Sequence, residues 1–190
     1  AILSDKDSHV LYIFPTKALA QDQLRSLRQI SCPELLSPEA VATFDGDTPP
    51  TERAGIRKHA KAVLTNPDMI HLGILPNHSS WSKLLRHLRC VVIDEAHVYR
   101  GVFGSHVANV LRRLRRICAY YGSSPQFICC SATIANPREH AQNLVGLPFE
   151  VVTEDGSPHG EKYFAFWNPP IIDETKSTRR SSNSEAAFLF

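Results

Sequence analysis

The stretch Cys90-Val-Val-Ile-Asp-Glu-Ala-His97 joins four apolar residues to two adjacent carboxylates and a histidine. A continuous apolar run of this length is typical of a strand that is buried on both faces of a parallel sheet. Adjacent carboxylates directly after such a strand match the arrangement that serves a nucleotide-bound Mg²⁺. Asp94 would help to hold the ion, and Glu95 would orient and polarise the attacking water. Because an isolated Asp-Glu pair is more often a solvated acidic turn, the interpretation depends on the rest of the chain.

Short apolar runs recur along the chain and alternate with longer segments of helical period. The runs predict strands at residues 10–14, 40–44, 62–65, 90–93, 126–130 and 149–152. The periodic segments predict helices at residues 17–30, 51–59, 81–88, 105–121 and 137–145. Strands that alternate with helices at this spacing form crossover units, so the sequence predicts an α/β fold with a mainly parallel sheet.

Five of the predicted strands are followed directly by small, polar or charged residues. These strand ends are Pro15-Thr16-Lys17, Asp45-Gly46-Asp47, Thr65-Asn66-Pro67, Asp94-Glu95-Ala96-His97 and Ser131-Ala132-Thr133. In open parallel sheets, ligands bind at the carboxyl ends of the strands. Small residues and backbone N–H groups at these ends can approach phosphates closely, and Lys17 adds a positive charge. The sequence therefore predicts a ligand site along this edge of the sheet.

The five strand ends together resemble the first RecA-like domain of superfamily-2 DEAD/DEAH-box helicases. The run from Pro15 to Gln23 (PTKALAQDQ) resembles motif Ia, Asp45-Gly-Asp47 motif Ib, Thr65-Asn-Pro-Asp68 the next strand-end motif, Asp94-Glu-Ala-His97 motif II and Ser131-Ala-Thr133 motif III. Longer stretches are similar to one branch, the RecQ-four-like (Hrq-type) ATP-dependent DNA helicases: TNPDMIH at 65–71, VYRGVFGSH at 98–106, and DGSP at 155–158 through WNPP at 167–170. The resemblance covers residues 10–170 and implies a RecA-like, P-loop NTPase type of sheet.

The resemblance also implies roles for particular residues, with ATP and Mg²⁺ as cofactors. Asp94 and Glu95 match the catalytic pair that holds Mg²⁺ through the nucleotide and activates water. His97, at the nucleotide, and Ser131 and Thr133 match residues that couple nucleotide state to movement between domains. Six residues match positions that line a single-strand track: Thr16, Lys17, Gly46, Asp47, Thr65 and Asn66. Thr65 could instead cap a helix, and Gly46 could supply only a tight turn.

The function that the resemblance implies is a 3'–5' DNA helicase that couples ATP hydrolysis to translocation and duplex unwinding. Its partners would be single-stranded or forked DNA, its process DNA repair, and its compartment the nucleus, or the cytoplasm in a bacterium. Two alternatives stay open: DEAD/DEAH cores also act on RNA, and a chain without turnover could bind nucleic acid or a partner protein. Glu95 favours the motor, because a pure binder has no need of a water-activating glutamate.

Composition agrees with a globular α/β protein and limits the partners. The 190 residues are 43% hydrophobic and 21% charged, with a formal net charge of +2, so a nucleic-acid site must be a local patch. The apolar runs are far shorter than the ~20 residues of a membrane span, so no membrane partner is expected. The five cysteines are odd in number and mostly lie in apolar stretches, which predicts reduced, buried thiols and a cytosolic or nuclear compartment.

Two groups of residues allow both a binding and a packing interpretation. Four arginines lie off the apolar stripe of the helix at 105–121, where a solvated outer face is favoured over phosphate binding: Arg112, Arg113, Arg115 and Arg116. Trp81 and Tyr99 could stack on bases, and core packing explains them at least as well.

No stretch fits the phosphate-binding pattern G-x-x-x-x-G-K-[ST]. We therefore expect residues 1–153 to be a partial first RecA-like domain, 154–185 a turn, an aromatic strand at 163–167 and a polar linker, and 186–190 the start of a second RecA-like domain. The phosphate-binding segment and the second domain would be supplied by the remainder of the same protein. The 190 residues alone are expected to lack measurable ATPase activity and to be marginally stable, because strands next to the missing one would lose partners.

Overall fold

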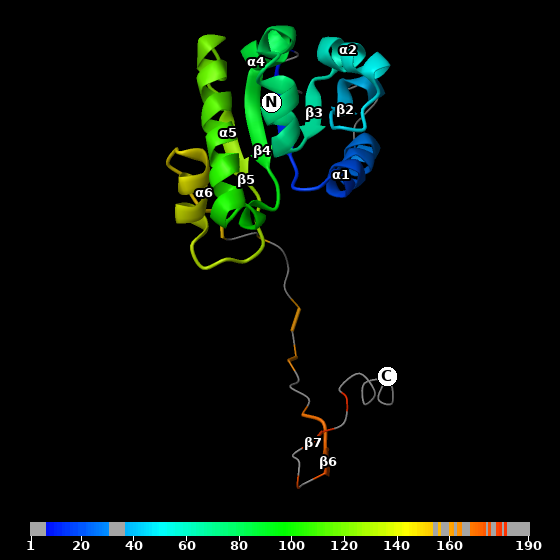
Figure 1. Cartoon of the computed structure of the whole chain (residues 1–190), viewed down its shortest axis with the longest axis vertical. Helices are drawn as coiled ribbons and strands as arrows, with labels where there is room; N and C mark the ends of the chain where they lie inside the picture. The colour runs from blue at the N-terminus through cyan, green and yellow to red at the C-terminus, as the bar shows by residue number, and fades with distance from the viewer. Residues whose placement is uncertain are drawn as a thin grey trace. The chain divides into compact units, whose positions relative to one another are not determined.

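The structure, a computed structural model, describes residues 7–30, 37–153, 156, 160–161, 163–164, 168–173, 175, 178–179 and 181. The chain divides into two compact units, Ala1–Val151 and Val152–Phe190. The elements of the first unit and their order along the chain can be followed in Figure 1.

The first unit is built around a five-stranded parallel sheet in the order β2-β3-β1-β4-β5. The central strands are buried on both faces, as their continuous apolar sequences predict, and Leu11, Val63 and Val91 are 0% exposed. The strands are β1 (His9–Ile13), β2 (Val41–Thr43), β3 (Ala62–Thr65), β4 (Leu88–Ile93) and β5 (Gln126–Cys129).

Helices cover both faces of this sheet and create two hydrophobic cores. α1 (Lys17–Ile30) packs Ala20 and Leu24 against Phe14, Val41 and Leu64 on one face. The larger core joins the other face to the remaining helices, above all to the apolar stripe of α5 (Gly101–Tyr120). The other helices are α2 (Pro50–His59), α3 (Pro67–Met69), α4 (Ser82–Arg86) and α6 (Pro137–Val145), with short turns at Pro38–Ala40 (η1), Ile70–Ile74 (η2, a π-helix), His78–Trp81 (η3) and Ala96–Val98 (η4).

The α/β fold with a parallel RecA-like sheet is confirmed, but two local predictions are wrong and one helical segment was missed. No strand forms at 149–152: Phe149 packs against the core and Val152 is 89% exposed, so this apolar run is fixed by side-chain packing and not by a ladder. The helix predicted at 81–88 begins as the turn His78–Trp81 and stops at Arg86, because Leu88 already belongs to β4. The helical segment that follows Asn66 was not predicted.

The second unit contains one antiparallel pair, β6 (Ile171–Asp173) with β7 (Thr178–Arg179). The sequence predicted no strand at these residues, and the polar linker within 154–185 stays a prediction. Tyr163 and Phe164 are exposed and belong to no strand. The predicted turn at 154–158, the rest of the aromatic strand and the domain start at 186–190 lie wholly or mostly outside the described residues.

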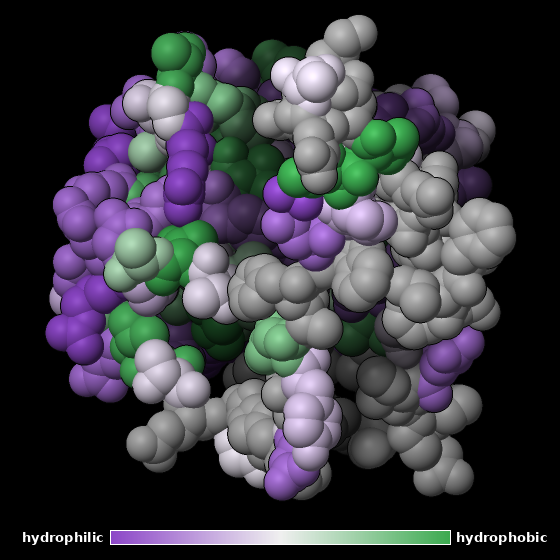
Figure 2. All heavy atoms as spheres, turned by 90° about the horizontal axis from the view of Figure 1, so that it is seen from below, coloured by the Kyte–Doolittle hydropathy of each residue, from purple (hydrophilic) through white to green (hydrophobic). Residues whose placement is uncertain are grey.

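The surface of the described residues mixes polar and apolar side chains. Figure 2 shows hydrophobic residues in separate patches between hydrophilic ones on the face seen from below. Within the described ranges, no helix has the length and apolarity that crossing a membrane requires.

The cysteines differ from one another in burial. Burial raises the pKa of Cys118 to about 11 and that of Cys129 to about 12, so both thiols stay protonated near neutral pH. Cys90 is half-buried, but Cys130 is exposed, so the prediction of a buried thiol is wrong there because Cys130 lies just past the end of β5. Cys32 lies outside the described residues.

Candidate nucleotide and nucleic-acid site

Backbone hydrogen bonds extend the sheet past the ends of its strands and hold the predicted site turns side by side. Phe14 N donates to Thr65 O at 2.9 Å, and Asp94 N donates to Ile13 O at 2.9 Å. Cys130 N donates to Ile93 O, also at 2.9 Å. The turns that follow β1, β3, β4 and β5 therefore lie at one edge, where parallel sheets bind ligands.

The turn after β4 places the two carboxylates in a conformation that the sequence did not reveal. Glu95 has φ 49° and ψ 41°, in the left-handed region that costs a non-glycine residue roughly 1–2 kcal/mol. Its neighbour Ala96 fixes the turn from two sides: Ala96 N donates to Cys130 O at 2.8 Å, and His140 Nε2 donates to Ala96 O at 2.7 Å. Such strain persists where the surroundings over-determine it, and it is concentrated at functional sites.

His97 connects this acidic turn to the turn after β5. Ala132 N donates to His97 Nδ1 at 3.3 Å, and His97 Nε2 lies 3.3 Å from Glu95 Oε2. Because Nδ1 accepts a backbone hydrogen bond, the neutral ring carries its proton on Nε2, the nitrogen that lies near the Glu95 carboxylate. The predicted residues Glu95 and His97 are thus in contact. His97 also contacts the backbone of Ala132, which lies between Ser131 and Thr133.

The carboxylates create a negative field that no described cation neutralises. Burial, and then the charges of Asp94 and Glu95, raise the pKa of the Cys130 thiol. Burial, and then the charge of Asp94, raise the pKa of Tyr99 well above its ordinary value. Within the described ranges no lysine or arginine forms an ion pair with Asp94.

This donor set fits magnesium that arrives with a nucleotide. Mg²⁺ in nucleotide sites is held by one or two carboxylates and by phosphates, and it keeps several waters. The half-buried Asp94 and Glu95 can supply those carboxylates. Among the described residues no cluster of three or more His, Cys, Asp or Glu side chains could hold a metal by protein ligands alone.

The turns after β1 and β2 meet through an ion pair. Lys17 Nζ lies 2.7 Å from Asp47 Oδ2, and this contact raises the pKa of Lys17. Thr16 precedes the first residue of α1, and its Oγ1 accepts a hydrogen bond from Leu19 N at 3.4 Å. Gly46 and Asp47 are exposed at the tip of their turn.

Thr65 and Asn66 serve the local structure where they stand. Thr65 is 1% exposed, and its hydroxyl donates to Phe44 O at 2.7 Å, so it binds the end of β2 to the end of β3. Asn66 Oδ1 accepts from Met69 N at 2.8 Å and caps α3, the role that the sequence had offered to Thr65. Nucleic-acid contact by these two residues stays a prediction, and the burial of Thr65 restricts it to a positioning role.

The turn after β5 is open to solvent. Ser131 and Thr133 are exposed, and Ser131 Oγ donates to the carbonyl of Ala132 at 2.8 Å. Both side chains are therefore free of the core, as a coupling role requires.

Sequence reasoning missed His140 and settled neither Trp81 nor Tyr99. His140 lies on α6, 44 positions after the residue that it contacts, and only the packing of α6 against α5 reveals the contact. Trp81 and Tyr99 are each 1% exposed, so they pack in the core and present no stacking surface.

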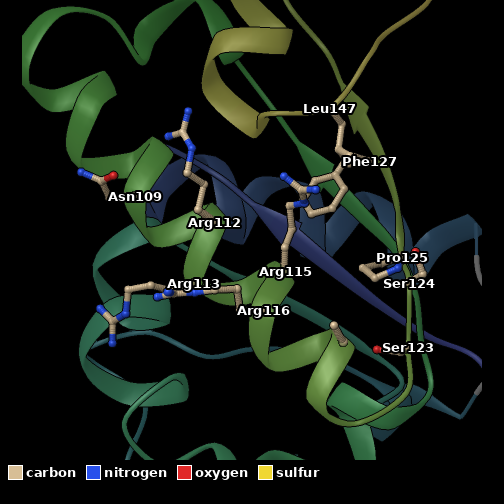
Figure 3. Close-up of a pocket in the computed structure, with 11 residues that line it drawn as sticks. Asn109, Arg112, Arg113, Arg115, Arg116, Ser123, Ser124, Pro125, Phe127 and Leu147 are labelled. Carbon is tan, nitrogen blue, oxygen red and sulfur yellow. The ribbon is translucent and has the colours of Figure 1, made fainter.

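The α5 arginines line a hollow of about 740 Å³ beside β5, and Figure 3 shows Arg112 and Arg115 extending toward α6. Arg115 Nη1 donates to Val145 O at 3.1 Å and to Gly146 O at 2.9 Å, and Arg112 Nη2 donates to Asn143 O at 3.2 Å. These carbonyls end α6, where cations are favoured. Arg112 is exposed, as the solvated-face interpretation predicts, and Arg115 is half-buried; both arginines also stabilise the helix end.

Comparison with known proteins gives a consistent answer. Residues 1–140 match the family model of the DEAD/DEAH box helicases. The chain is 52% identical to the ATP-dependent helicase YprA of Bacillus subtilis (strain 168), with 100% of this chain and 25% of YprA covered. It is 50% identical to the ATP-dependent helicase HRQ1 of Saccharomyces cerevisiae (strain ATCC 204508 / S288c), with 99% of this chain and 18% of HRQ1 covered.

The solved structures that resemble this fold are helicases as well. The crystal structure of the DUF1998 helicase MrfA bound to DNA superposes with a TM-score of 0.93 at 52% identity, covering 99% of this chain and 25% of MrfA. The helicase Lhr of Mycobacterium smegmatis bound to ssDNA and AMP-PNP matches with a TM-score of 0.57 at 29% identity, covering 71% of this chain and 18% of Lhr. The chain thus spans a quarter or less of each of these four relatives.

Proposed function

Because this chain belongs to the DEAD/DEAH box helicase family, we propose that it is part of an ATP-dependent DNA helicase. The edge formed by the turns after β1 to β5 carries part of the ATP site and part of the track for one nucleic-acid strand. The observation that carries this proposal is the connection from Glu95 through His97 to the backbone of Ala132. In this proposal, the groups beside the nucleotide contact an exposed turn that can face a second domain.

Each residue of the acidic turn has a chemical task in this proposal. ATP with Mg²⁺ supplies the phosphoanhydride bond whose hydrolysis drives the motor. Asp94 would help to hold the coordination shell of Mg²⁺. Glu95 would accept a hydrogen bond from the attacking water and orient it. His97 Nε2 lies 3.3 Å from Glu95 Oε2, so His97 can help to position that carboxylate. A change at Glu95 reaches Ala132 through the same imidazole, which gives Ser131 and Thr133 their coupling role.

The strand track uses the start of α1 and the turn after β2. The first N–H groups of a helix have no intrahelical partner and favour anions. Thr16 and Lys17 lie at this end of α1, and Gly46 allows close approach in the neighbouring turn. The track contacts the phosphate backbone at these residues, whereas Thr65 and Asn66 hold the turn between them.

DNA is proposed over RNA because MrfA, at 52% identity, is described with DNA bound. The 3'–5' direction, a task in DNA repair and a nuclear or bacterial cytoplasmic location belong to the same proposal. The DEAD-box helicase Mss116 bound to ssRNA matches with a TM-score of 0.57 at 18% identity, which supports the fold alone.

The test measures ATP turnover by the full-length protein without nucleic acid, with a single-stranded DNA and with an RNA of the same sequence. We expect DNA to stimulate turnover more than RNA does, and a duplex with a 3' single-stranded tail to be unwound faster than one with a 5' tail. Stronger stimulation by RNA would favour the RNA helicase. Tight DNA binding without any turnover would favour the binding module.

A further inference from the structure

Lys17, the cation of the proposed track, already has an anionic partner in the structure. Its ammonium lies 2.7 Å from Asp47 Oδ2, close enough for a charge-assisted hydrogen bond. The two side chains are 48% and 77% exposed and come from different turns, 30 positions apart. The pair therefore lies on the surface that nucleic acid would approach.

The Asp47 turn is built to present its carboxylate. Asp45, only 4% exposed, accepts hydrogen bonds at Oδ1 from Asp47 N at 2.9 Å and from Thr48 N at 3.1 Å. The backbone N–H of Asp45 in turn donates a hydrogen bond to Thr48 Oγ1 at 2.9 Å, so hydrogen bonds close the turn at both ends. One buried aspartate thus shapes the loop, and the next aspartate is left free for Lys17.

Gly46 adds a second sign that Lys17 lies folded against this turn. A Cβ on Gly46 would lie 3.6 Å from Lys17 Nζ, which is ordinary contact distance. The ammonium is therefore held beside the turn, where a phosphate approaching the start of α1 would meet it together with the Asp47 carboxylate.

A carboxylate and a phosphate compete for the same ammonium. Exposed ion pairs are weak and exchange readily, because water screens them and both side chains lose freedom in the pair. A phosphate that binds Lys17 must displace Asp47 or accept its repulsion, so each contact at this position is weaker than a lysine alone would give. Weak, exchangeable contacts suit a track that has to release the strand at every step.

We propose that Asp47 is an electrostatic counter-ion that Lys17 exchanges for a nucleic-acid phosphate, and that this exchange lowers the affinity of the track and favours release of the strand. The inference rests on the proposed function, because it assigns regulation to the same strand track.

The experiment measures binding of the full-length protein to a fluorescent oligothymidylate by anisotropy, over a series of salt concentrations. The variants are Asp47→Asn, Lys17→Ala and the double variant. Asp22→Asn is the matched control, because it also removes one exposed carboxylate that pairs with a cation, Arg25, on α1. Thermal unfolding of each variant checks that these exposed substitutions leave the fold unchanged.

We expect Asp47→Asn to tighten binding by about two- to fivefold at low salt, the upper part of the range for one exposed ion pair. The slope of log affinity against log salt should steepen by up to about 0.7, the value for one single-strand phosphate contact. Lys17→Ala should weaken binding, and Asp47→Asn should then have little further effect. Asp22→Asn should change affinity less than twofold.

Each other outcome overturns a different part of the account. If Lys17→Ala weakens binding while Asp47→Asn leaves it unchanged or weakens it, the counter-ion role is refuted and the track stands. If Asp47→Asn tightens binding equally without Lys17, or no more than Asp22→Asn does, the effect is general charge and the exchange is refuted. If Lys17→Ala leaves binding unchanged, the proposed track itself loses its cation.

Discussion

Glu95 shows how a single residue links the backbone to the chemistry. It is the one non-glycine with positive φ among the described residues, and hydrogen bonds of its neighbour Ala96 with Cys130, just past β5, and with His140 of α6 hold it there. A glycine would adopt this conformation without strain but would remove the carboxylate. The proposed role of the carboxylate accounts for the retained strain.

His9 gives a residue-level prediction about pH. Burial is the main cause that lowers its pKa below the ordinary 6.5; the hydrogen bond to Asp7 O opposes this shift, and the charges of Lys83, His87 and Lys61 add to it. The unfolded chain therefore binds a proton at a higher pH than the folded protein does. Stability from this residue is complete above about pH 6.5 and is lost as the pH falls toward the lowered folded pKa.

His9→Gln should therefore make the free energy of unfolding less dependent on pH between 7.5 and 5.5, since the amide has no proton to gain (roughly 1.4 kcal/mol per unit of pKa shift is at stake). Thermal unfolding of both full-length proteins across this range measures the difference. A parallel decline of the two proteins would contradict the assigned cause.

At most site residues the sequence predicted the location correctly and could not predict the conformation. Buried strands and polar strand ends alternate clearly, so Asp94, Glu95 and Lys17 could be placed at one edge. The partners depend on contacts between distant segments, such as His140 with Ala96. The burial of Thr65 depends on the depth of a strand end, which a pattern of residue types does not encode.

Among the elements, α5 depends on one close approach. A Cβ on Gly104 would overlap the backbone carbonyl of Tyr99, the residue that follows the acidic turn. Gly55, in α2, has nothing within 4 Å of such a Cβ. Both glycines lie in helices, so they form a matched pair that compares a tightly packed position with an open one.

Gly104→Ala should destabilise the protein by roughly 1–3 kcal/mol, because α5 must move away from the turn. Gly55→Ala should instead stabilise it by about 0.5–1 kcal/mol through helix propensity alone. Urea unfolding of the two full-length variants measures both. Equal effects of the two substitutions would show that the packing at Gly104 is not tight.

The elements also show where sequence patterns stop being informative. Long periodic helices and buried strands were located within a few residues, because burial dictates their period. The π-helix Ile70–Ile74 and the missing strand at 149–152 differ from expectation because short apolar runs pack equally well in several backbone conformations. The helix predicted at 81–88 differs from the observed one at both ends for the same reason.

At the scale of the whole molecule, the chain spans 25% of YprA and 18% of HRQ1. Among the described residues β5 pairs only with β4, and its Ile128 is 42% exposed. No stretch of the 190 residues fits the phosphate-binding glycine loop. Residues 1–190 alone are therefore expected to show no measurable ATP turnover, and nucleic-acid-stimulated turnover by them would contradict this expectation.

The measurement that tests the acidic turn most directly is ATP turnover and nucleotide affinity of the full-length Glu95→Gln protein. With exposed Glu52→Gln on α2 as the control, Glu95→Gln should lower DNA-stimulated turnover by about 10²–10⁴-fold, the usual contribution of a positioned base. Its affinity for nucleotide should stay within about threefold, because Asp94 and the charge of the ion remain. Turnover equal to that of the Glu52→Gln protein would contradict the assignment of Glu95 and, with it, the proposed ATP site.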